Sequence, residues 1–217
     1  MDDYASVRKL MVQQQIEPWA VNNNKVLDAF NNVPRHMFLP ESVKYQAYHD
    51  KSILVNNIEL LAPKVLAKIF NGMEIESTDR VLLVGVGFGY SYAIAYQLSN
   101  SIIGLETDLD AYELSKLYLS QQHIPLDGLF HQDGHLGFPD LAPYDKIIFT
   151  GAFDIFPSPT IFEQLSHRGL CFFFAQSDGV QNGYLVSKTG SEITQSIVFE
   201  SYVPFLSNIV RDTSFHL

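Results

Sequence analysis

The chain has 217 residues, of which 47% are hydrophobic and 18% are charged, a balance typical of one globular domain. Its formal net charge of -10, without any cluster of Lys and Arg, argues against nucleic acid as a partner. The one cysteine, Cys171, cannot form an intramolecular disulfide. The sequence shows no signal-peptide pattern and no apolar run long enough to cross a membrane, so a cytoplasmic protein that does not bind membranes is expected.

The N-terminal third is predicted to form a helical extension. Apolar stripes in residues 4–11 and 26–30 predict two short helices, the second of which is capped by the asparagines at 22–24. Residues 33–40 (VPRHMFLP) contain a proline near each end and are expected to be largely extended. The pattern further predicts a helix over 41–48, an irregular connection over 51–61, and a helix over 62–73 that has proline in its first turn.

A buried strand that runs into a glycine-rich turn, residues 81–90 (VLLVGVGFGY), is the most informative pattern. The turn comprises Gly85, Val86, Gly87, Gly89 and Tyr90, and a helix is expected to follow it. Glycine lets backbone N–H groups approach a ligand closely, and the amino end of a helix favours anionic groups. The G-x-G-x-G spacing fits S-adenosylmethionine better than NAD, whose enzymes use G-x-G-x-x-G. The alternative is a strand-to-helix turn without a ligand.

Strand and helix patterns alternate from residue 80 onward, which predicts an α/β fold with a doubly wound, mostly parallel sheet. A turn at 189–192 between two strand-like segments is too short for a crossover helix, so an antiparallel hairpin is expected to end the sheet. One domain, 1–217, is predicted, made of an extension (1–75), a ligand-binding core (76–178) and antiparallel strands (179–217). The predicted strands are 81–85, 101–105, 129–131, 146–150, 169–175, 183–188 and 193–203, and the helices within the sheet region begin at 91 and cover 109–120 and 158–166.

Ligands of such sheets bind beyond the carboxyl ends of the strands, so the strand tips predict the crevice. Glu106 ends the second strand, where its carboxylate can accept hydrogen bonds from ribose hydroxyls. Asp133 and Gly134 follow the third strand, and Asp133 is either an acceptor for an exocyclic amine such as adenine N6 or a turn cap. Thr150 and Gly151 follow the fourth strand.

A metal site is not predicted. His131 and His135 are close in sequence, but a turn-forming Asp-Gly pair separates them, and the sequence contains neither HExxH nor a cysteine cluster.

Several blocks of sequence carry a resemblance to a known family. In chain order they are MVQQQI (11–16), VPRHMFLP (33–40), VLLVGVGFGY (81–90), GLE (104–106), QDG (132–134), APYDKIIFTGA (142–152) and YVPFL (202–206). Together they resemble the protein-L-isoaspartate O-methyltransferase family. The resemblance implies the Rossmann-like fold of class I S-adenosylmethionine methyltransferases, with S-adenosylhomocysteine as the product. It also implies that Gly85, Gly87 and Gly89 cradle the methionine end of the cofactor, that Glu106 holds the ribose, and that Asp133 faces the adenine.

The family methylates isoaspartyl carboxylates in damaged proteins and peptides, so the resemblance implies a repair enzyme with these partners. A carboxylate is ionised at neutral pH, so it needs no general base, and catalysis depends on aligning the reactants and removing water. The family lines its acceptor pocket with a Thr-x-Ser pair, whereas NIELLAP (57–63) places Glu59 and Leu61 at these positions. Two further departures, Leu83 for the usual acid and Phe88 for a small residue, imply weaker cofactor binding.

These departures leave three hypotheses open. The chain is an isoaspartyl methyltransferase with a rearranged acceptor loop, or a methyltransferase for an unknown small acceptor with Glu59 as its catalytic base, or a non-catalytic binding protein. A glutamate about 4 Å from a carboxylate acceptor costs on the order of 4 kcal/mol at an effective dielectric constant near 20. The sequence leaves the oligomeric state open.

Overall fold

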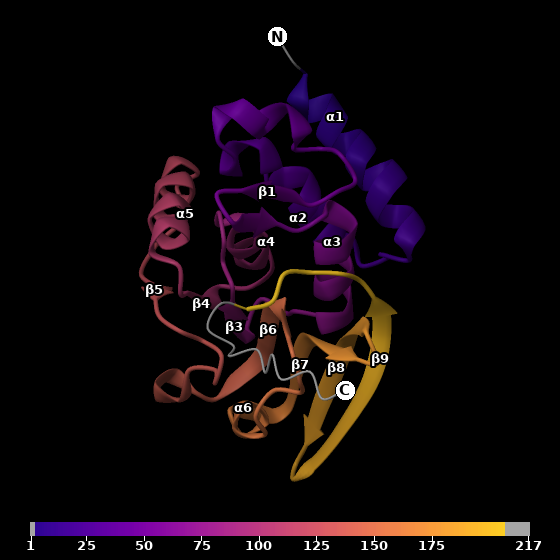
Figure 1. The fold of residues 1–217 in the computed structure, drawn as a ribbon, viewed down its shortest axis with the longest axis vertical. Coiled ribbons are helices and arrows are strands. Elements are labelled where there is room, and N and C mark those ends of the chain that lie inside the picture. The colour runs from indigo at the N-terminus through magenta and orange to yellow at the C-terminus, as the bar shows by residue number, and fades with distance from the viewer. Residues whose placement is uncertain (1–2, 207–217) are drawn as a thin grey trace, which may run out of the picture.

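The computed structural model describes residues 3–206. A seven-stranded sheet runs through these residues in the order β5-β4-β3-β6-β7-β8-β9 (Figure 1). Neighbouring strands from β5 to β7 are parallel, and β8 and β9 are antiparallel to their neighbours. The predicted mostly parallel sheet with a C-terminal antiparallel hairpin is confirmed. The strands are β3 (Arg80–Val84), β4 (Ser101–Glu106), β5 (Leu129–His131), β6 (Tyr144–Phe153), β7 (Leu165–Ser177), β8 (Val180–Thr189) and β9 (Glu192–Glu200).

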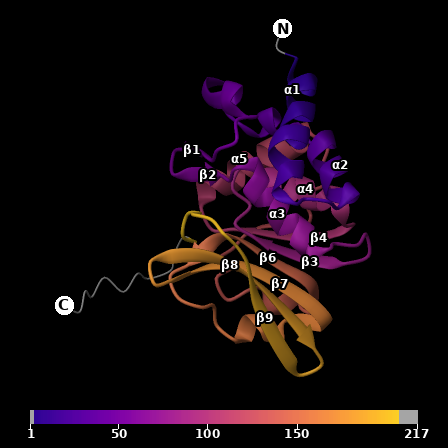
Figure 2. The same ribbon diagram turned by 90° about the vertical axis from the view of Figure 1, so that its right-hand side faces the viewer.

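Helices cover the two faces of the sheet unequally (Figures 1 and 2). Leu83 and Phe172 pack toward the helix-rich face, whereas Leu82 and Phe173 pack toward the other. Because side chains alternate along a strand, burial of both faces requires the continuous apolar runs that made these strands recognisable. The helix-rich side carries α1 (Tyr4–Met11), α2 (Asn24–Asn32), α3 (Pro63–Met73), α4 (Tyr90–Leu98) and α5 (Leu109–Gln121), and the other side carries α6 (Thr160–Glu163).

The helix predicted over residues 158–166 is much shorter than expected. Only Thr160–Glu163 form α6. Leu165 already pairs with Tyr144 as the first residue of β7, so the sheet takes the residues that the periodicity assigned to a helix. Ladder hydrogen bonds to β6 outweigh a weak local helix preference at this point.

Two predictions for the N-terminal extension were wrong. Residues 33–40 are not fully extended, because Arg35–Phe38 form a 3-10 helix closed by a hydrogen bond from Met37 N to Pro34 O (2.9 Å). Proline restricts mainly the residue before it, so Pro34 leaves this turn open. Residues 51–61 are not irregular but form a hairpin of β1 (Ile53–Val55) and β2 (Ile58–Leu60). Its two turn residues have φ values of 50° and 66°, the left-handed pair typical of a type I′ turn.

The remaining connections are short helical turns. They are a π-helical turn (Val12–Ile16) and 3-10 turns at Glu17–Trp19, Glu41–Gln46 and Pro139–Leu141. The turn at Glu41–Gln46 occupies most of the segment predicted as helical at 41–48.

The segment after β9 returns to the centre of the sheet. β9 ends at Glu200, earlier than the predicted 203, and the chain then crosses the carboxyl ends of the strands. Ala152 N donates to Pro204 O at 2.8 Å, and Leu206 N donates to Ala152 O at 2.9 Å. These two bonds attach residues 204–206 to the tip of β6. Residues 207–217, the remainder of the predicted C-terminal part, lie outside the described residues.

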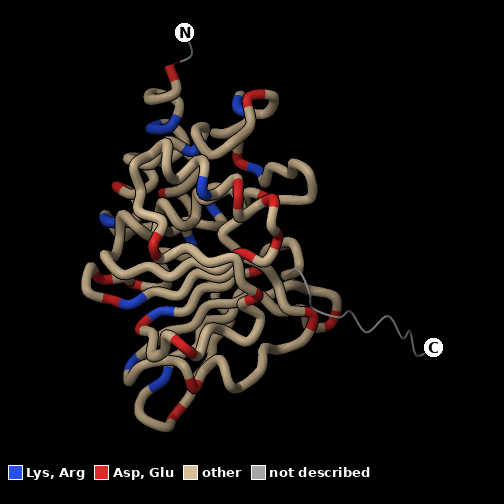
Figure 3. The backbone as a smooth tube through the Cα atoms, turned by 90° about the vertical axis from the view of Figure 1, so that its left-hand side faces the viewer, with Lys and Arg blue, Asp and Glu red and all other residues tan. Residues whose placement is uncertain are grey.

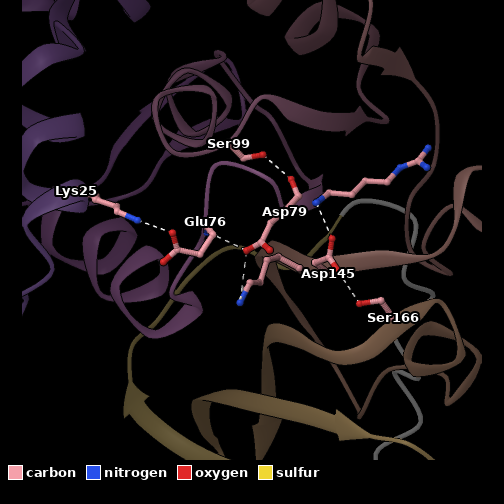
Figure 4. A network of polar contacts seen from close by, with 8 residues as sticks. Lys25, Glu76, Asp79, Ser99, Asp145 and Ser166 are labelled. Atoms are coloured by element: carbon pink, nitrogen blue, oxygen red, sulfur yellow. Dashed lines mark hydrogen bonds and ion pairs between the residues drawn. The ribbon is translucent and has the colours of Figure 1, made fainter.

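Acidic and basic residues are scattered along the backbone (Figure 3). A network of polar contacts lies at the amino ends of the strands (Figure 4). Asp79 accepts a hydrogen bond from Glu76 N at 2.9 Å and lies 3.7 Å from Lys146 Nζ. Lys146 is buried, so Asp79 supplies its counter-charge. A second acid, Asp145, accepts from Arg80 N at 2.9 Å and from Ser166 Oγ at 2.6 Å. The network joins the loop before β3 to β6 and β7.

We expect Asp79→Ala to lower the free energy of unfolding by about 2 kcal/mol, because it leaves Lys146 buried without a counter-charge. Urea unfolding followed by circular dichroism measures this. Adding Lys146→Met should recover most of the loss, because an apolar side chain then replaces the buried charge. Purely additive losses in the double variant would contradict this account.

Candidate active site

A cavity lies at the carboxyl ends of β3, β4, β5 and β6, where the sequence predicts a crevice. Segments distant in sequence meet there: the glycine turn, the strand tips, the β1–β2 hairpin and the segment that returns after β9. The structure brings together six of the predicted site residues on its lining, namely Glu59, Gly85, Gly87, Glu106, Asp133 and Gly134.

The glycine turn has a backbone that other residues rarely adopt. Gly85, Gly87 and Gly89 have φ values of 87°, 57° and 95°. A β-carbon on Gly85 would lie 2.4 Å from Thr150 Oγ1, and that hydroxyl donates to Gly85 O at 2.6 Å. A side chain is therefore excluded on two grounds, conformation and space. The turn presents backbone to the cavity, as a loop that binds a ligand closely requires.

Glu106 is the polar centre of the cavity. Its Oε2 accepts from Gly87 N at 2.7 Å, and its Oε1 accepts from Thr107 N at 2.9 Å and Asp108 N at 3.0 Å. The side chain is 7% exposed. Burial raises the pKa of the Glu106 carboxyl above its ordinary value, and the three backbone donors oppose that shift. A carboxylate offers about four acceptor positions, so about one remains for a ligand hydroxyl.

Asp133 is a turn cap, one of the two roles that the sequence left open, and it also lies on the cavity lining. Its Oδ1 accepts from His135 N at 3.0 Å, which closes the turn after β5. Gly134 lies beneath it, where a β-carbon would approach Val84 Cγ1 to 2.7 Å. Only glycine lets the chain pass this close to the end of β3.

We call residues 53–61 the acceptor hairpin, because they include Glu59 and Leu61, the two positions that the resemblance aligns with the Thr-x-Ser pair. Glu59 and Leu61 both line the cavity. Strand pairing places Glu59 opposite Leu54, which is 64% exposed, so Glu59 shares the outward face of the hairpin. A β-carbon on Gly87 would lie 3.7 Å from Glu59 O, so the hairpin passes directly over the glycine turn.

The Glu59 carboxylate makes no hydrogen bond or ion pair with residues 3–206. The hydroxyls of Ser52 and Thr150 are engaged in other contacts. Ser52 Oγ accepts from Ala62 N at 3.2 Å, and Thr150 donates into the glycine turn. Glu59 and Asn57 are the polar residues of the acceptor hairpin on the cavity lining, and Glu59 is the charged one.

Three predicted cofactor residues do not line the cavity: Val86, Gly89 and Tyr90. Tyr90 is fully buried, and its ring packs edge-on against Phe30 and Phe38 at centroid distances of 6.0 and 5.6 Å. Gly89 instead begins α4 as its N-cap. These residues support the glycine turn from the side that packs against the core.

The two unusual residues of this region also point away from the cavity. Leu83 and Phe88 are both fully buried, and Phe88 packs against Tyr118 of α5 at 6.5 Å. Neither side chain obstructs the cavity, so the weaker cofactor binding that the sequence implied has no steric basis here.

Sequence reasoning missed part of the cavity lining. Thr107, Asp108 and Gln132 follow strand tips, so the rule that placed Glu106 and Asp133 there could have included them. The wall formed by Pro204, Phe205 and Leu206 depends on contacts between distant parts of the chain, and no local pattern reveals it.

In the part of the chain that the structure describes, no three His, Cys, Asp or Glu residues are grouped to hold a metal ion, and no helix is long and apolar enough to span a bilayer.

The sequence matches known proteins over most of its length. Residues 6–209 match the family model for protein-L-isoaspartate(D-aspartate) O-methyltransferase. The protein-L-isoaspartate O-methyltransferase of Methanospirillum hungatei is 33% identical over 170 residues, which are 78% of this chain and 78% of that protein. The protein of the same name from Methanoculleus marisnigri is 31% identical over 163 residues, 75% of this chain and 74% of that protein.

Solved structures share the fold. A protein-L-isoaspartate O-methyltransferase structure superposes with a TM-score of 0.80 and 22% identity over 92% of this chain, which spans 65% of that longer chain. A Plasmodium falciparum protein assigned to the same activity, solved in complex with S-adenosyl-L-homocysteine, gives a TM-score of 0.78 and 18% identity over 92% of this chain and 97% of that one.

The family match covers nearly the whole described chain, and the fold and the cavity at the strand tips agree with it. The chain belongs to the protein-L-isoaspartate O-methyltransferase family.

Proposed function

We propose that this chain, an S-adenosylmethionine-dependent methyltransferase by family and fold, methylates isoaspartyl carboxylates in damaged proteins and peptides. The supporting observation is that one cavity joins the glycine turn and Glu106 to the acceptor hairpin. A turn that excludes side chains at Gly85 and a buried carboxylate beside it fit a cofactor that carries a ribose.

Each part of the cavity has a distinct role in this proposal. Bound S-adenosylmethionine supplies an electrophilic methyl group. Gly85 and Gly87 present backbone to the methionine end, Glu106 accepts from ribose hydroxyls, and Asp133 faces the adenine. The acceptor carboxylate is ionised and needs no base, so the acceptor hairpin and residues 204–206 contribute by orienting it and excluding water.

A second candidate function follows from Glu59. Glu59 lines the cavity and its carboxylate has no partner among residues 3–206, which suits a general base for a hydroxyl or amine acceptor. The same carboxylate would repel an isoaspartyl acceptor. The two functions therefore predict opposite effects of removing its charge.

Transfer of labelled methyl from S-adenosylmethionine to an isoaspartyl peptide tests the proposed function directly. We expect labelling of the isoaspartyl peptide and none of the matched aspartyl peptide. A family enzyme of established activity serves as the positive control. Absence of transfer under conditions in which that enzyme works would refute the isoaspartyl assignment.

Glu59→Gln should raise kcat/KM for the isoaspartyl peptide at least about fivefold, because even in water two charges 4 Å apart repel by about 1 kcal/mol. Steady-state kinetics measures this. Glu192→Gln, at the start of the outer strand β9, is the matched control and should leave the rate unchanged. Loss of most activity in Glu59→Gln would instead identify Glu59 as a base.

Cofactor affinity should fall as the pH is lowered through the raised pKa of Glu106. The ionised carboxylate accepts hydrogen bonds, so affinity is present above that pKa and is lost below it, at a higher pH than for an ordinary glutamate. Calorimetric titration with S-adenosylhomocysteine over a descending pH series measures this. Glu106→Gln should bind more weakly and remove the pH dependence; an unchanged pH profile in that variant would exclude Glu106 as its source.

A further inference from the structure

Arg35 is a fully buried cation that the proposed chemistry does not yet use. It begins the 3-10 helix after Pro34, and its side chain is 0% exposed. The other buried charges have compensation: Lys146 lies near Asp79, and Glu106 accepts three backbone N–H groups. Among residues 3–206 no carboxylate pairs with Arg35, and burying a charge without a counter-charge is costly.

Its hydrogen bonds go to backbone carbonyls. Nε donates to Ala47 O at 2.8 Å, and Nη2 donates to Leu61 O at 2.7 Å. Leu61 is the last residue of the acceptor hairpin and lines the cavity. The guanidinium therefore fixes the end of the acceptor hairpin through the backbone of Leu61. Leu61 stands at one of the two positions that the resemblance aligns with a hydroxyl.

The third contact of Arg35 leads to the cofactor side. Its Cζ lies 5.1 Å from the ring centroid of Tyr90, the first residue of α4 after the glycine turn. Arg35 Nη1 and Tyr90 Oη are both buried without a partner within the described residues. The scaffold thus leaves the guanidinium incompletely satisfied, although buried polar groups normally find partners.

Arg35 remains charged at neutral pH. Burial lowers its pKa to about 10, which is still well above neutrality. A charge with no counter-ion in a medium of low dielectric constant acts over a longer range than a solvated one. An anion entering the cavity beside Leu61 would feel this positive charge together with the negative charge of Glu59.

We propose that Arg35 is the positioning residue of the acceptor side: it holds the acceptor hairpin at Leu61, and its unpaired charge favours an anionic acceptor in the cavity. The proposal rests on the proposed function for its second half. It also explains how a family member with Glu59 in place of a hydroxyl still admits a carboxylate.

The test compares two variants. Arg35→Met removes the charge and the donors, whereas Arg35→Lys keeps the charge but cannot donate to Ala47 O and Leu61 O in the same forked geometry. Arg80→Met is the matched control, because Arg80 also lies over a tyrosine ring, 5.8 Å from Tyr144, and has a buried Nε without a partner, but it begins β3 at the opposite end of the sheet. All measurements are made on the full chain, well below the lowest melting temperature.

We expect amide hydrogen exchange of residues 53–61 to accelerate in both Arg35 variants and not in Arg80→Met. Acceptor KM should rise about tenfold in Arg35→Met, the size of one lost charged hydrogen bond, and less in Arg35→Lys. The dissociation constant for S-adenosylhomocysteine should stay within about twofold in all variants.

Several outcomes would overturn the proposal. An unchanged acceptor KM in Arg35→Met, with only a lower melting temperature, would make Arg35 a structural residue. A parallel loss of cofactor affinity would place its effect on the glycine turn. If Arg35→Met does not fold, Arg35→Lys decides, and unchanged exchange in residues 53–61 refutes the hold on the hairpin. If the unmodified chain transfers no methyl, the proposed function fails, whereas the exchange measurement still tests this hold.

Discussion

The cavity depends on how the buried Glu106 carboxylate is held. A buried carboxylate is costly unless hydrogen bonds compensate it, and here the compensation comes from Gly87 and from the chain that leads into α5. These bonds tie the glycine turn after β3 to the tip of β4. The close contacts of Gly85 with Thr150 and of Gly134 with Val84 pack around the same junction. The cofactor side of the cavity is therefore formed mainly by backbone atoms, and its close contacts leave little room for substitution at Gly85 and Gly134.

The acceptor side follows a different principle. The Thr-x-Ser pair is replaced, and the charged residues on this side are the half-buried Glu59 on the cavity lining and the fully buried Arg35, which binds the hairpin. Hydrogen bonds of hydroxyls fix an acceptor within a few tenths of an ångström, whereas charges act over a longer range with less directional control. An acceptor bound mainly by charge is consequently selected by its ionisation more than by its shape.

Elements with strong local signals could be predicted from the sequence. The strands β3 to β7, the helices α3 to α5 and the strand-tip residues Glu106 and Asp133 follow from apolar runs and from the rule for open sheets. The acceptor hairpin could not be predicted, because its Asn-Asn turn is a weak signal and its strands are short. Nor could the burial of Arg35 or Tyr90, since a charged residue between prolines and a tyrosine after glycine have no local reason to be inside. Such positions depend on tertiary packing that a periodic pattern does not encode.

The wall at residues 204–206 has a consequence for how the protein is made. It is bonded to the tip of β6, yet it follows the whole β8–β9 hairpin in the chain. Proteins emerge from the ribosome amino end first, so the glycine turn, Glu106 and the acceptor hairpin are all synthesised before the segment that closes their cavity. A nascent chain that has reached only β9 holds every other wall of the site and lacks this one. The wall at residues 204–206 is thus synthesised after every other wall of the cavity.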